Sequence, residues 1–480
     1  MTEYEAVIGL ETHIQLNTNS KIFCSCKADS WDDPPNTNIC PVCTGLPGVL
    51  PVLNRKVVEK AVLLAAAMHA EKIAPVSYMD RKNYFYPDLP KGYQISQYDR
   101  SVAKGGYLDV PMPDGEMRRV GIHKLHIEED AGKTVRQRDC RWIDFNRCGV
   151  PLIEMVTEPD LRSADEAAQY LIRLRQLLRW IGVSEADMER GQLRCDGNVS
   201  IREKGTAVLN TKTEIKNVNS IENLRDAIAA EIERQIRTVE AGEEVKPWTL
   251  DWDDNTSTLR KMRSKETEAD YRYFREPDLL PVVLDDSWRE EILKDLPELP
   301  LERRQRFMDE YDLPQYDAEI LTEDRSRSEY YEKTVEAFGG DPKAVSNWMI
   351  NDVLRMMREI GKGADELQLK PDFLASIIKA VVDKKITSNT GKKLLEKVEQ
   401  SGRNPEEIIE EEGLAQVSDD SALRPVVETI LAANPEQVDA YRNGKETLIG
   451  WFVGQVMRES RGKANPQLVK QILEEMLNSE

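Results

Sequence analysis

The stretch LETHIQL, residues 10–16, alternates apolar and polar side chains one by one. A β-strand sends successive side chains to opposite faces, so Glu11, His13 and Gln15 would share one face while Leu10 and Ile14 enter the core. A carboxylate and an imidazole two positions apart on a strand can hold one cation or a phosphate-bound metal. The stretch therefore predicts a sheet with one face suited to chemistry.

Four cysteines follow this strand in two close pairs, with C-x-C and C-x-x-C spacing and about thirteen residues between the pairs. Thiols spaced in this way are typical of a structural zinc site with four ligands and no open position. The alternative is four reduced thiols packed in a core. We expect a zinc knuckle over residues 24–43, with the ligands Cys24, Cys26, Cys40 and Cys43.

Length and composition limit the class of protein. The chain has 480 residues, which is too long for one core and indicates two or three domains. Its longest apolar run, residues 61–68, is too short to cross a bilayer, and no export signal begins the chain, so we expect a cytoplasmic protein without a membrane segment. A net charge of −20 argues against a protein coated in nucleic acid but allows a local basic patch.

The pattern of elements predicts an α+β fold. Strand signals are confined to the first 280 residues or so, and short amphipathic helices follow from residue 288 to the end. A capping box at Ser163 and an N-cap at Ser220 begin two of the helices between the strands. We expect a mixed sheet with helices on one side. The expected strands are residues 6–16, 120–128, 152–156, 192–202 and 208–218.

Several acidic residues repeat the period-two pattern on these strands. Asp196 and Glu214 have polar partners two positions away, Glu154 is the one charge in an apolar strand, and residues 128–130 are three consecutive acids. If these faces converge, two charges about 4 Å apart repel by roughly 4 kcal/mol, so the site must take up protons or hold a hard cation. Oxygen ligands with an imidazole suit magnesium or manganese. The alternative for each acid is a solvated strand position, although the apolar surroundings of Glu154 favour a functional role.

Cations next to aromatic residues form a second signal. Residues 81–93 make a proline-broken loop with Lys82 and Lys91, and residues 260–265 contain four cations. Such clusters suit phosphates and stacked bases, although each could be a solvated charge run. No GxxxxGK[ST] or GxGxxG motif is present, so a nucleotide would have to be held in another way. A glycine-rich and aromatic helix over residues 444–457 precedes a basic edge, which could equally be an ordinary packing helix.

These segments together resemble the B-subunit family of bacterial aspartyl/glutamyl-tRNA amidotransferases. The match runs in family order over nearly the whole chain, and several of its segments are long and unusual. They are VIGLETHIQL (7–16), NICPVCTGLPGVLPVLN (38–54), RKNYFYPDLPKGYQISQ (81–97), HIEEDAGK (126–133), DFNRCGVPLIEMVTEPD (144–160), RCDGNVSIR (194–202), TEIKNVNS (213–220), RSKETEADYRYFREPDL (263–279) and GQVMRESRGKANPQLV (454–469).

The resemblance implies a cradle domain related to the glutamine synthetase catalytic fold over residues 1–290, an all-α helical domain over 291–405 and a small all-α tail domain over 406–480. It implies a heterotrimer, in which an amidase A-subunit hydrolyses glutamine and passes ammonia through a channel, together with a small C-subunit. This chain would bind Glu-tRNA(Gln) or Asp-tRNA(Asn) and use ATP and Mg²⁺ to phosphorylate the side-chain carboxylate, which ammonia then converts to the amide. The sequence leaves open which of the two routes is used.

The resemblance also implies site residues, while leaving open which acids bind metal directly. The residues expected to line the metal site and the mouth of the ammonia channel are Glu11, His13, Glu129, Glu154, Asp196 and Glu214, all except Glu154 as Mg²⁺ ligands. Those expected to bind the phosphates of ATP are Lys82, Lys91, Lys216 and Arg263, and those expected to hold the tRNA are Arg458, Arg461, Lys463 and Lys470. Two rival interpretations are a non-catalytic RNA-binding protein with a zinc knuckle, and an archaeal relative with a large inserted domain, for which this length leaves little room.

Overall fold

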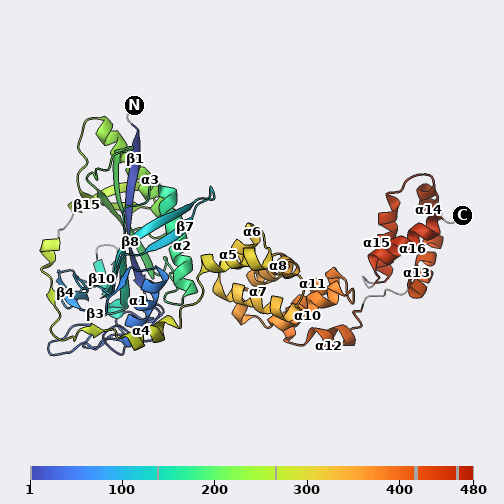
Figure 1. The fold of residues 1–480 in the computed structure, drawn as a ribbon, viewed down its shortest axis with the longest axis horizontal. Helices are drawn as coiled ribbons and strands as arrows, with labels where there is room; N and C mark the ends of the chain where they lie inside the picture. The colour runs from blue at the N-terminus through green and yellow to red at the C-terminus, as the bar shows by residue number, and fades with distance from the viewer. Residues whose placement is uncertain (1–2, 138–139, 265–267, 416–419, 461–463, 479–480) are drawn as a thin grey trace. The chain divides into compact units, whose positions relative to one another are not determined.

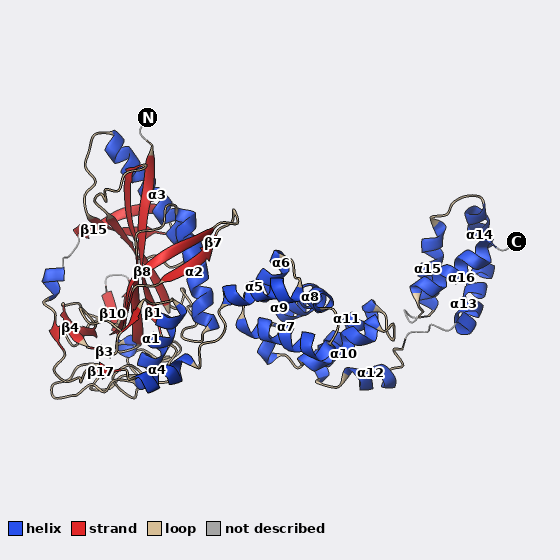
Figure 2. Cartoon of the chain, viewed as in Figure 1, coloured by secondary structure: helices blue, strands red, loops and turns tan. Residues whose placement is uncertain are grey.

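The computed structural model describes residues 3–137, 140–264, 268–415, 420–460 and 464–478. The chain divides into two compact units, Met1–Leu299 and Pro300–Glu480. Figure 2 shows that the described strands belong to the first unit, whereas the second is built from helices. The expected α+β class, with a sheet-rich N-terminal part and a helical C-terminal part, is confirmed.

A ten-stranded sheet forms the centre of the first unit. Its middle strand is β1 (Tyr4–Gln15), which pairs antiparallel with β12 (Leu193–Glu203) on one side and with β11 (Pro151–Thr157) on the other. Strand β8 (Met117–Glu129) continues the sheet beyond β11. The alternation in residues 10–16 sets the face of β1, because Leu10 and Ile14 are at most 1% exposed and enter the core.

Three long helices contribute to the apolar core of this unit: α1 (Arg55–Ala67), α2 (Ala164–Trp180) and α3 (Ile221–Glu240). The predicted capping box begins α2, since the Ser163 hydroxyl accepts from the Glu166 N–H and the Glu166 carboxylate accepts from the Arg162 N–H. At the start of α3 the Ser220 hydroxyl accepts from the Asn223 N–H. Figure 1 shows α2 and α3 running along the sheet, and the opposite, polar face of β1 stays available for a site.

Shorter strands complete the first unit. The predicted strand 208–218 is too long, because only β13 (Thr213–Lys216) forms, and Val208 and Leu209 are exposed. The main sheet also contains β2 (Lys72–Ile73), β6 (Ala103–Lys104), β7 (Tyr107–Pro111), β14 (Trp248–Asp253) and β15 (Thr258–Ser264). The smaller sheets are β4 (Asp80–Asn83) with β5 (Tyr93–Ser96) and β16 (Phe274–Arg275), β9 (Lys133–Gln137) with β10 (Cys140–Asp144), and β3 (Val76–Ser77) with β17 (Val282–Val283).

The second unit has two separate buried clusters, one over residues 307–408 and one over residues 423–477. The expected domain boundary at 405/406 falls at the start of α12, whose Ile408 packs in the first cluster. Helix α4 (Asp286–Leu293) precedes this unit in the sequence. Among the described residues, no helix is long and apolar enough to cross a membrane. The first cluster is built on α5 (Pro300–Tyr311), α6 (Gln315–Leu321), α7 (Arg325–Phe338), α8 (Pro342–Trp348), α9 (Leu354–Ile360), α10 (Pro371–Val382), α11 (Ser388–Ser401) and α12 (Pro405–Glu411), and the second on α13 (Asp420–Ala433), α14 (Pro435–Arg442), α15 (Leu448–Glu459) and α16 (Pro466–Asn478).

Candidate functional site

Strand register brings the predicted acids together across the middle of the sheet. Glu11 on β1 lies opposite Asp196 on β12, and His13 on β1 lies opposite Glu154 on β11. Glu154 in turn lies opposite His126 on β8. Side chains at paired positions point to the same face of a sheet, so segments more than a hundred residues apart in the sequence present their polar groups to one space.

His13 is the shared member of two groups with ligand geometry. Its Nε2 lies 3.8 Å from Glu11 Oε1, 3.7 Å from Glu154 Oε2 and 4.0 Å from Glu128 Oε1. In each group the ligand atoms lie within 4.8 Å of one another. The first group is Glu11, His13 and Asp196, and the second is His13, Glu128 and Glu154. We call them together the acid–imidazole cluster.

A buried histidine organises the inner end of this cluster. His126 Nε2 lies 3.3 Å from Glu154 Oε2 and 3.7 Å from Glu128 Oε2. Burial by itself would lower the pKa of His126, but the two carboxylates outweigh it and raise the pKa to about 9. Burial likewise opposes ionisation of the two carboxyls, yet His126 holds the pKa of both Glu128 and Glu154 below its usual range. Both acids are therefore charged at neutral pH.

Two lysines face the cluster from either side. Burial would lower the pKa of Lys82, but the carboxylates of Glu128 and Glu154 raise it, and the Lys82 ammonium lies 4.8 Å from the centre of the Tyr271 ring. Lys216 forms an ion pair with Asp196, and this acid outweighs burial and raises the lysine pKa. The two cations keep their charge beside the acids, where phosphate oxygens could be bound.

Glu129 does not belong to the acid–imidazole cluster, although we expected it there. It points to the other face of β8, where it forms an ion pair with Lys91 and accepts from the Ile95 N–H at 2.8 Å. Lys91 is therefore also separated from Lys82, and both Lys91 and Glu129 line a cavity of about 220 Å³ next to Cys43. The resemblance implied Glu129 for the metal site, whereas the alternation of side chains on β8 places its neighbour Glu128 at the cluster.

The remaining predicted residues lie at the margin of the site or away from it. Glu214 sits on β13 with its Oε1 3.6 Å from Lys216 Nζ, and its Oε2 accepts from Thr249 Oγ1 at 3.0 Å, so it adjoins the cluster through Lys216. In the second unit, Arg458 is exposed on α15 and Lys470 is exposed on α16. The side chain of Arg263 and the whole of Arg461 and Lys463 lie outside the described residues.

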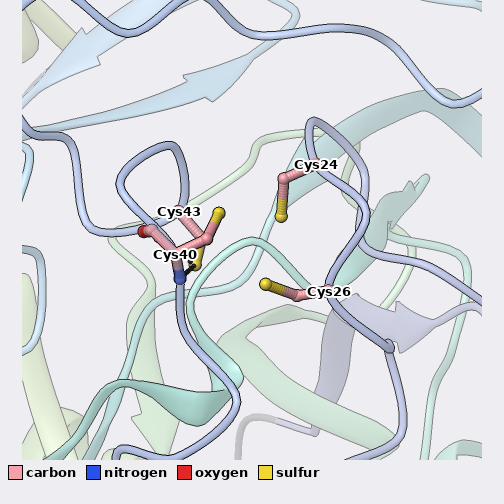
Figure 3. A group of neighbouring side chains, drawn as sticks. All are labelled: Cys24, Cys26, Cys40 and Cys43. Carbon is pink, nitrogen blue, oxygen red and sulfur yellow. Dashed lines mark hydrogen bonds between the residues drawn. The ribbon is translucent and has the colours of Figure 1, made fainter.

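The four predicted zinc ligands converge, as Figure 3 shows. Their Sγ atoms lie within 4.8 Å of one another, and the Cys40 N–H donates to Cys43 Sγ at 3.1 Å. A hydrogen bond from the Cys24 thiol lowers the pKa of Cys43, and the Lys21 ammonium, 3.8 Å away, adds to this effect. A tetrahedral zinc with Zn–S bonds of about 2.3 Å would separate the sulfurs by roughly 3.8 Å, so this cluster can bind a metal such as zinc.

The acid–imidazole cluster passes a similar test for a hard cation. Magnesium takes oxygen ligands at about 2.1 Å in an octahedron, which places neighbouring ligand atoms roughly 3 Å apart and opposite ones roughly 4 Å apart. Ligand atoms within 4.8 Å of one another approach these separations. Burial and the carboxylate of Glu154 raise the pKa of Glu11. A cation bound at the cluster would offset both effects and favour the charged form of Glu11.

Comparison with known proteins places this geometry in a family. A model of the GatB/GatE catalytic domain matches residues 6–290, and a model of the GatB domain matches residues 329–477. A protein of Thermodesulfovibrio yellowstonii, named as the B-subunit of an aspartyl/glutamyl-tRNA(Asn/Gln) amidotransferase, is 50% identical over 99% of both chains. The chain belongs to this B-subunit family. Proteins of the same name from Carboxydothermus hydrogenoformans and Persephonella marina are each 48% identical over 99% of this chain, and 99% and 100% of their own lengths.

Membership of the B-subunit family confirms the resemblance found in the sequence. The expectation of an enzyme component of the amidotransferase class, a ligase that acts in translation, is confirmed with it. The acid–imidazole cluster and the four-cysteine cluster both fall inside residues 6–290, the part that matches the catalytic domain. The tail helices with Arg458 and Lys470 fall inside the second matched part, residues 329–477.

Proposed function

We propose that this chain activates the side-chain carboxylate of a misacylated tRNA, Glu-tRNA(Gln) or Asp-tRNA(Asn), by phosphorylation with ATP, and that ammonia then replaces the phosphate. The relatives are named as components of tRNA(Asn/Gln) amidotransferases, which supports the substrate class. The observation that carries the proposal is the pair of ligand groups joined by His13 on the polar face of the sheet. Because the substrates are aminoacyl-tRNAs, we propose that the protein works in the cytoplasm.

The chemistry explains why such a site is needed. A carboxylate is a poor electrophile, because an oxide is a poor leaving group. Transfer of the γ-phosphoryl group forms an acyl phosphate and ADP, and attack by ammonia then breaks the C–O bond and releases phosphate, giving the amide. Phosphoryl transfer depends mainly on positioning and on stabilisation of charge. Bound at the acid–imidazole cluster, Mg²⁺ would supply a Lewis acid that offsets the negative charge of the phosphates.

The side chains divide this work. Glu11, His13 and Asp196, with Glu128 and Glu154, would hold the cation, and His126 fixes the last two acids as carboxylates. Lys82 and Lys216 approach the same space from opposite sides and would bind phosphate oxygens. We propose that Glu214 positions Lys216, because the two side chains lie 3.6 Å apart. Arg263 stays a candidate phosphate ligand from its place on β15.

Other parts of the chain support the larger assembly that we propose. A mixed, mostly antiparallel sheet with one open acidic face supports a cradle of the glutamine synthetase type. The naming of the relatives as a B-subunit supports the existence of partners, which we propose are an amidase A-subunit that supplies ammonia and a small C-subunit. Structural zinc in the four-cysteine cluster would brace the loop beside Lys91 and Glu129, where we propose that ammonia enters. The basic tail helices would hold the body of the tRNA.

A matched pair of glutamates on β1 tests this function. In the assembled enzyme, Glu11→Ala should leave binding of tRNA nearly intact and reduce ATP-dependent phosphorylation of the aminoacyl group at least a hundredfold, because it removes a cation ligand. Glu5→Ala on the same strand removes a carboxylate that pairs with Arg202 at 2.7 Å, away from the cluster, and should retain phosphorylation. Unchanged amidation in the Glu11 variant would favour a non-catalytic RNA-binding role instead.

A further inference from the structure

A lysine buried behind the four-cysteine cluster has no role in the proposed function. Lys21 is 0% exposed and is one of the largest fully buried side chains. Its Nζ donates to the Asn38 carbonyl at 2.9 Å and lies 3.8 Å from Cys43 Sγ. Among the described residues, Lys21 forms no ion pair with a carboxylate. A buried ammonium without a counter-charge is costly, so Lys21 calls for negative charge on the sulfur beside it.

Hydrogen bonds tie Lys21 to both halves of the cysteine loop. Its backbone N–H donates to the carbonyl of Cys26, in the first cysteine pair, at 2.8 Å. Its side chain reaches Asn38, close to the second pair, and Asn38 is itself fixed because its N–H donates to Asn146 Oδ1 at 2.8 Å. Cys43 is buried, whereas the other three cysteines of the cluster are partly exposed. The ammonium is therefore held at the inner, less solvated side of the cluster.

The charge of a filled zinc site gives this position a meaning. Zn²⁺ bound by four thiolates leaves two negative charges in excess, and burying them is costly unless a cation lies close by. Two cations line the cavity next to Cys43, but each already has a carboxylate partner. Lys91 forms an ion pair with Glu129, and Arg81 donates to both oxygens of Glu276 at 2.7 and 2.8 Å. Lys21 is directed at a sulfur instead.

We propose that Lys21 is the charge-balancing residue of the zinc site, where its ammonium lies beside the Cys43 thiolate and offsets the excess negative charge of the metal-bound sulfurs. This inference rests on the structural zinc of the proposed function and adds to it a positioning residue that is not a ligand. The excess charge arises when four thiolates bind the metal. Lys21 should therefore determine how tightly zinc is held, and should matter much less to the protein without zinc.

The test uses the full chain with the variants Lys21→Met and Lys21→Gln, which both remove the charge. Competition with a zinc chelator measures the Kd for zinc, with excess Mg²⁺ present so that zinc does not occupy the acid–imidazole cluster. Both variants should weaken zinc binding about tenfold to a hundredfold, as is usual when the partner of a metal ligand is lost. Lys27→Met is the matched control, since Lys27 lies on the same loop but is exposed and pairs with Asp33 at 2.7 Å, and it should bind zinc like the wild type.

Lys21→Gln separates charge from geometry, because its amide can still donate to the Asn38 carbonyl. Wild-type zinc affinity in Lys21→Gln, with weak binding only in Lys21→Met, would show that Lys21 merely holds the loop, and would overturn the inference.

Thermal unfolding gives a second measurement that a structural role would not reproduce. In Lys21→Met, the gap in unfolding temperature between the zinc-loaded and the zinc-stripped protein should shrink, because the loss falls on the loaded form. An equal fall in both forms would overturn the inference while leaving the zinc site in place. If the wild type binds no zinc in the chelator competition, the zinc site fails and the role of Lys21 fails with it. The proposed phosphorylation does not depend on either result, since it is carried by the acid–imidazole cluster.

Discussion

At the scale of single residues, Glu128 and Glu129 provide an internal comparison. They are neighbours in the chain, but Glu128 joins the acid–imidazole cluster while Glu129 pairs with Lys91 on the other face of β8. We predict that Glu128→Gln lowers the rate of aminoacyl phosphorylation about a hundredfold, because it removes one carboxylate from the cation site. The measurement is single-turnover formation of ADP with saturating substrates.

Glu129→Gln is the control and should behave differently. Both side chains of the Glu129–Lys91 pair are almost fully buried, so loss of the carboxylate leaves a buried ammonium without its partner. We expect a loss of stability of roughly 3–5 kcal/mol and a much smaller effect on phosphorylation. A phosphorylation defect that is equal in the two variants would mean that the faces of β8 are assigned wrongly.

Sequence alone predicts part of this site. Alternation around His13 and Asp196 predicted which side chains share a face, because the period of a strand is local information. It could not choose between Glu128 and Glu129, because that choice depends on the register between β8 and β11, which distant segments set. The role of His126 could not be read from the sequence for the same reason, since only its pairing with Glu154 shows that it fixes the charge of two acids.

At the scale of structural elements, the four-cysteine loop predicts a metal-dependent fold. We expect about one zinc per chain by metal analysis, following the rule of four ligands for one tetrahedral ion. Cys40→Ser should abolish stoichiometric zinc and lower the unfolding temperature, because a filled site can contribute roughly 10–16 kcal/mol on the scale of zinc-finger peptides. Cys140→Ser is the control, since Cys140 is exposed and outside the cluster. Four titratable thiols and no zinc in the purified protein would contradict this prediction.

Helix α6 carries an ion pair with a defined pH dependence. Burial raises the pKa of Asp317, but hydrogen bonds from Lys343 and Ser346 outweigh it, and the net pKa is lowered. The stabilisation of the fold by the Asp317 carboxylate is therefore complete above the usual carboxyl pKa of about 3.9. It is lost as the pH falls through the lower pKa that Asp317 has in the folded protein. Asp317→Asn should cost about 1 kcal/mol at pH 7, a modest figure because Lys343 is partly exposed.

Urea unfolding at several pH values measures this difference. The free energies of unfolding of wild type and Asp317→Asn should converge as pH falls below about 4, where the wild-type carboxyl also becomes neutral. Glu336→Gln on α7 is the control, because Glu336 is exposed and should show no such convergence. A constant gap at all pH values would assign the effect of Asp317→Asn to packing instead of charge.

Helices were more predictable than strands for a physical reason. The caps at Ser163 and Ser220 can be recognised from about four consecutive residues of sequence. Helices α2 and α3 begin where these caps predicted. The expected strand over residues 208–218 was wrong over more than half its length, because strand length depends on the partner, and β12 pairs only with residues 213–215 in this stretch. The strand order across the sheet could not be read from the sequence at all, since β1 lies between two strands that follow it by more than a hundred residues.

At the scale of the whole molecule, the proposed phosphorylation site and the helices proposed to bind tRNA belong to different units of the chain. The acid–imidazole cluster lies in the first unit, whereas α13–α16 share a buried cluster of their own within the second. We predict that deletion of residues 419–480 raises the KM for aminoacyl-tRNA about tenfold or more and leaves the rate at saturating tRNA nearly unchanged, because basic side chains outside the cation site act on binding alone.

A double variant keeps this prediction independent of folding. Arg458→Ala with Lys470→Ala removes two exposed cations from α15 and α16 without touching the buried cluster. It should weaken tRNA binding in the same direction and reduce its salt dependence, whereas Lys384→Ala with Lys385→Ala, exposed cations after α10, should not. Assembly with the partner proteins should survive in all these variants. Loss of assembly on deletion, with tRNA binding unaffected by the double variant, would show that the tail is an interface with a partner protein instead of a tRNA-binding part.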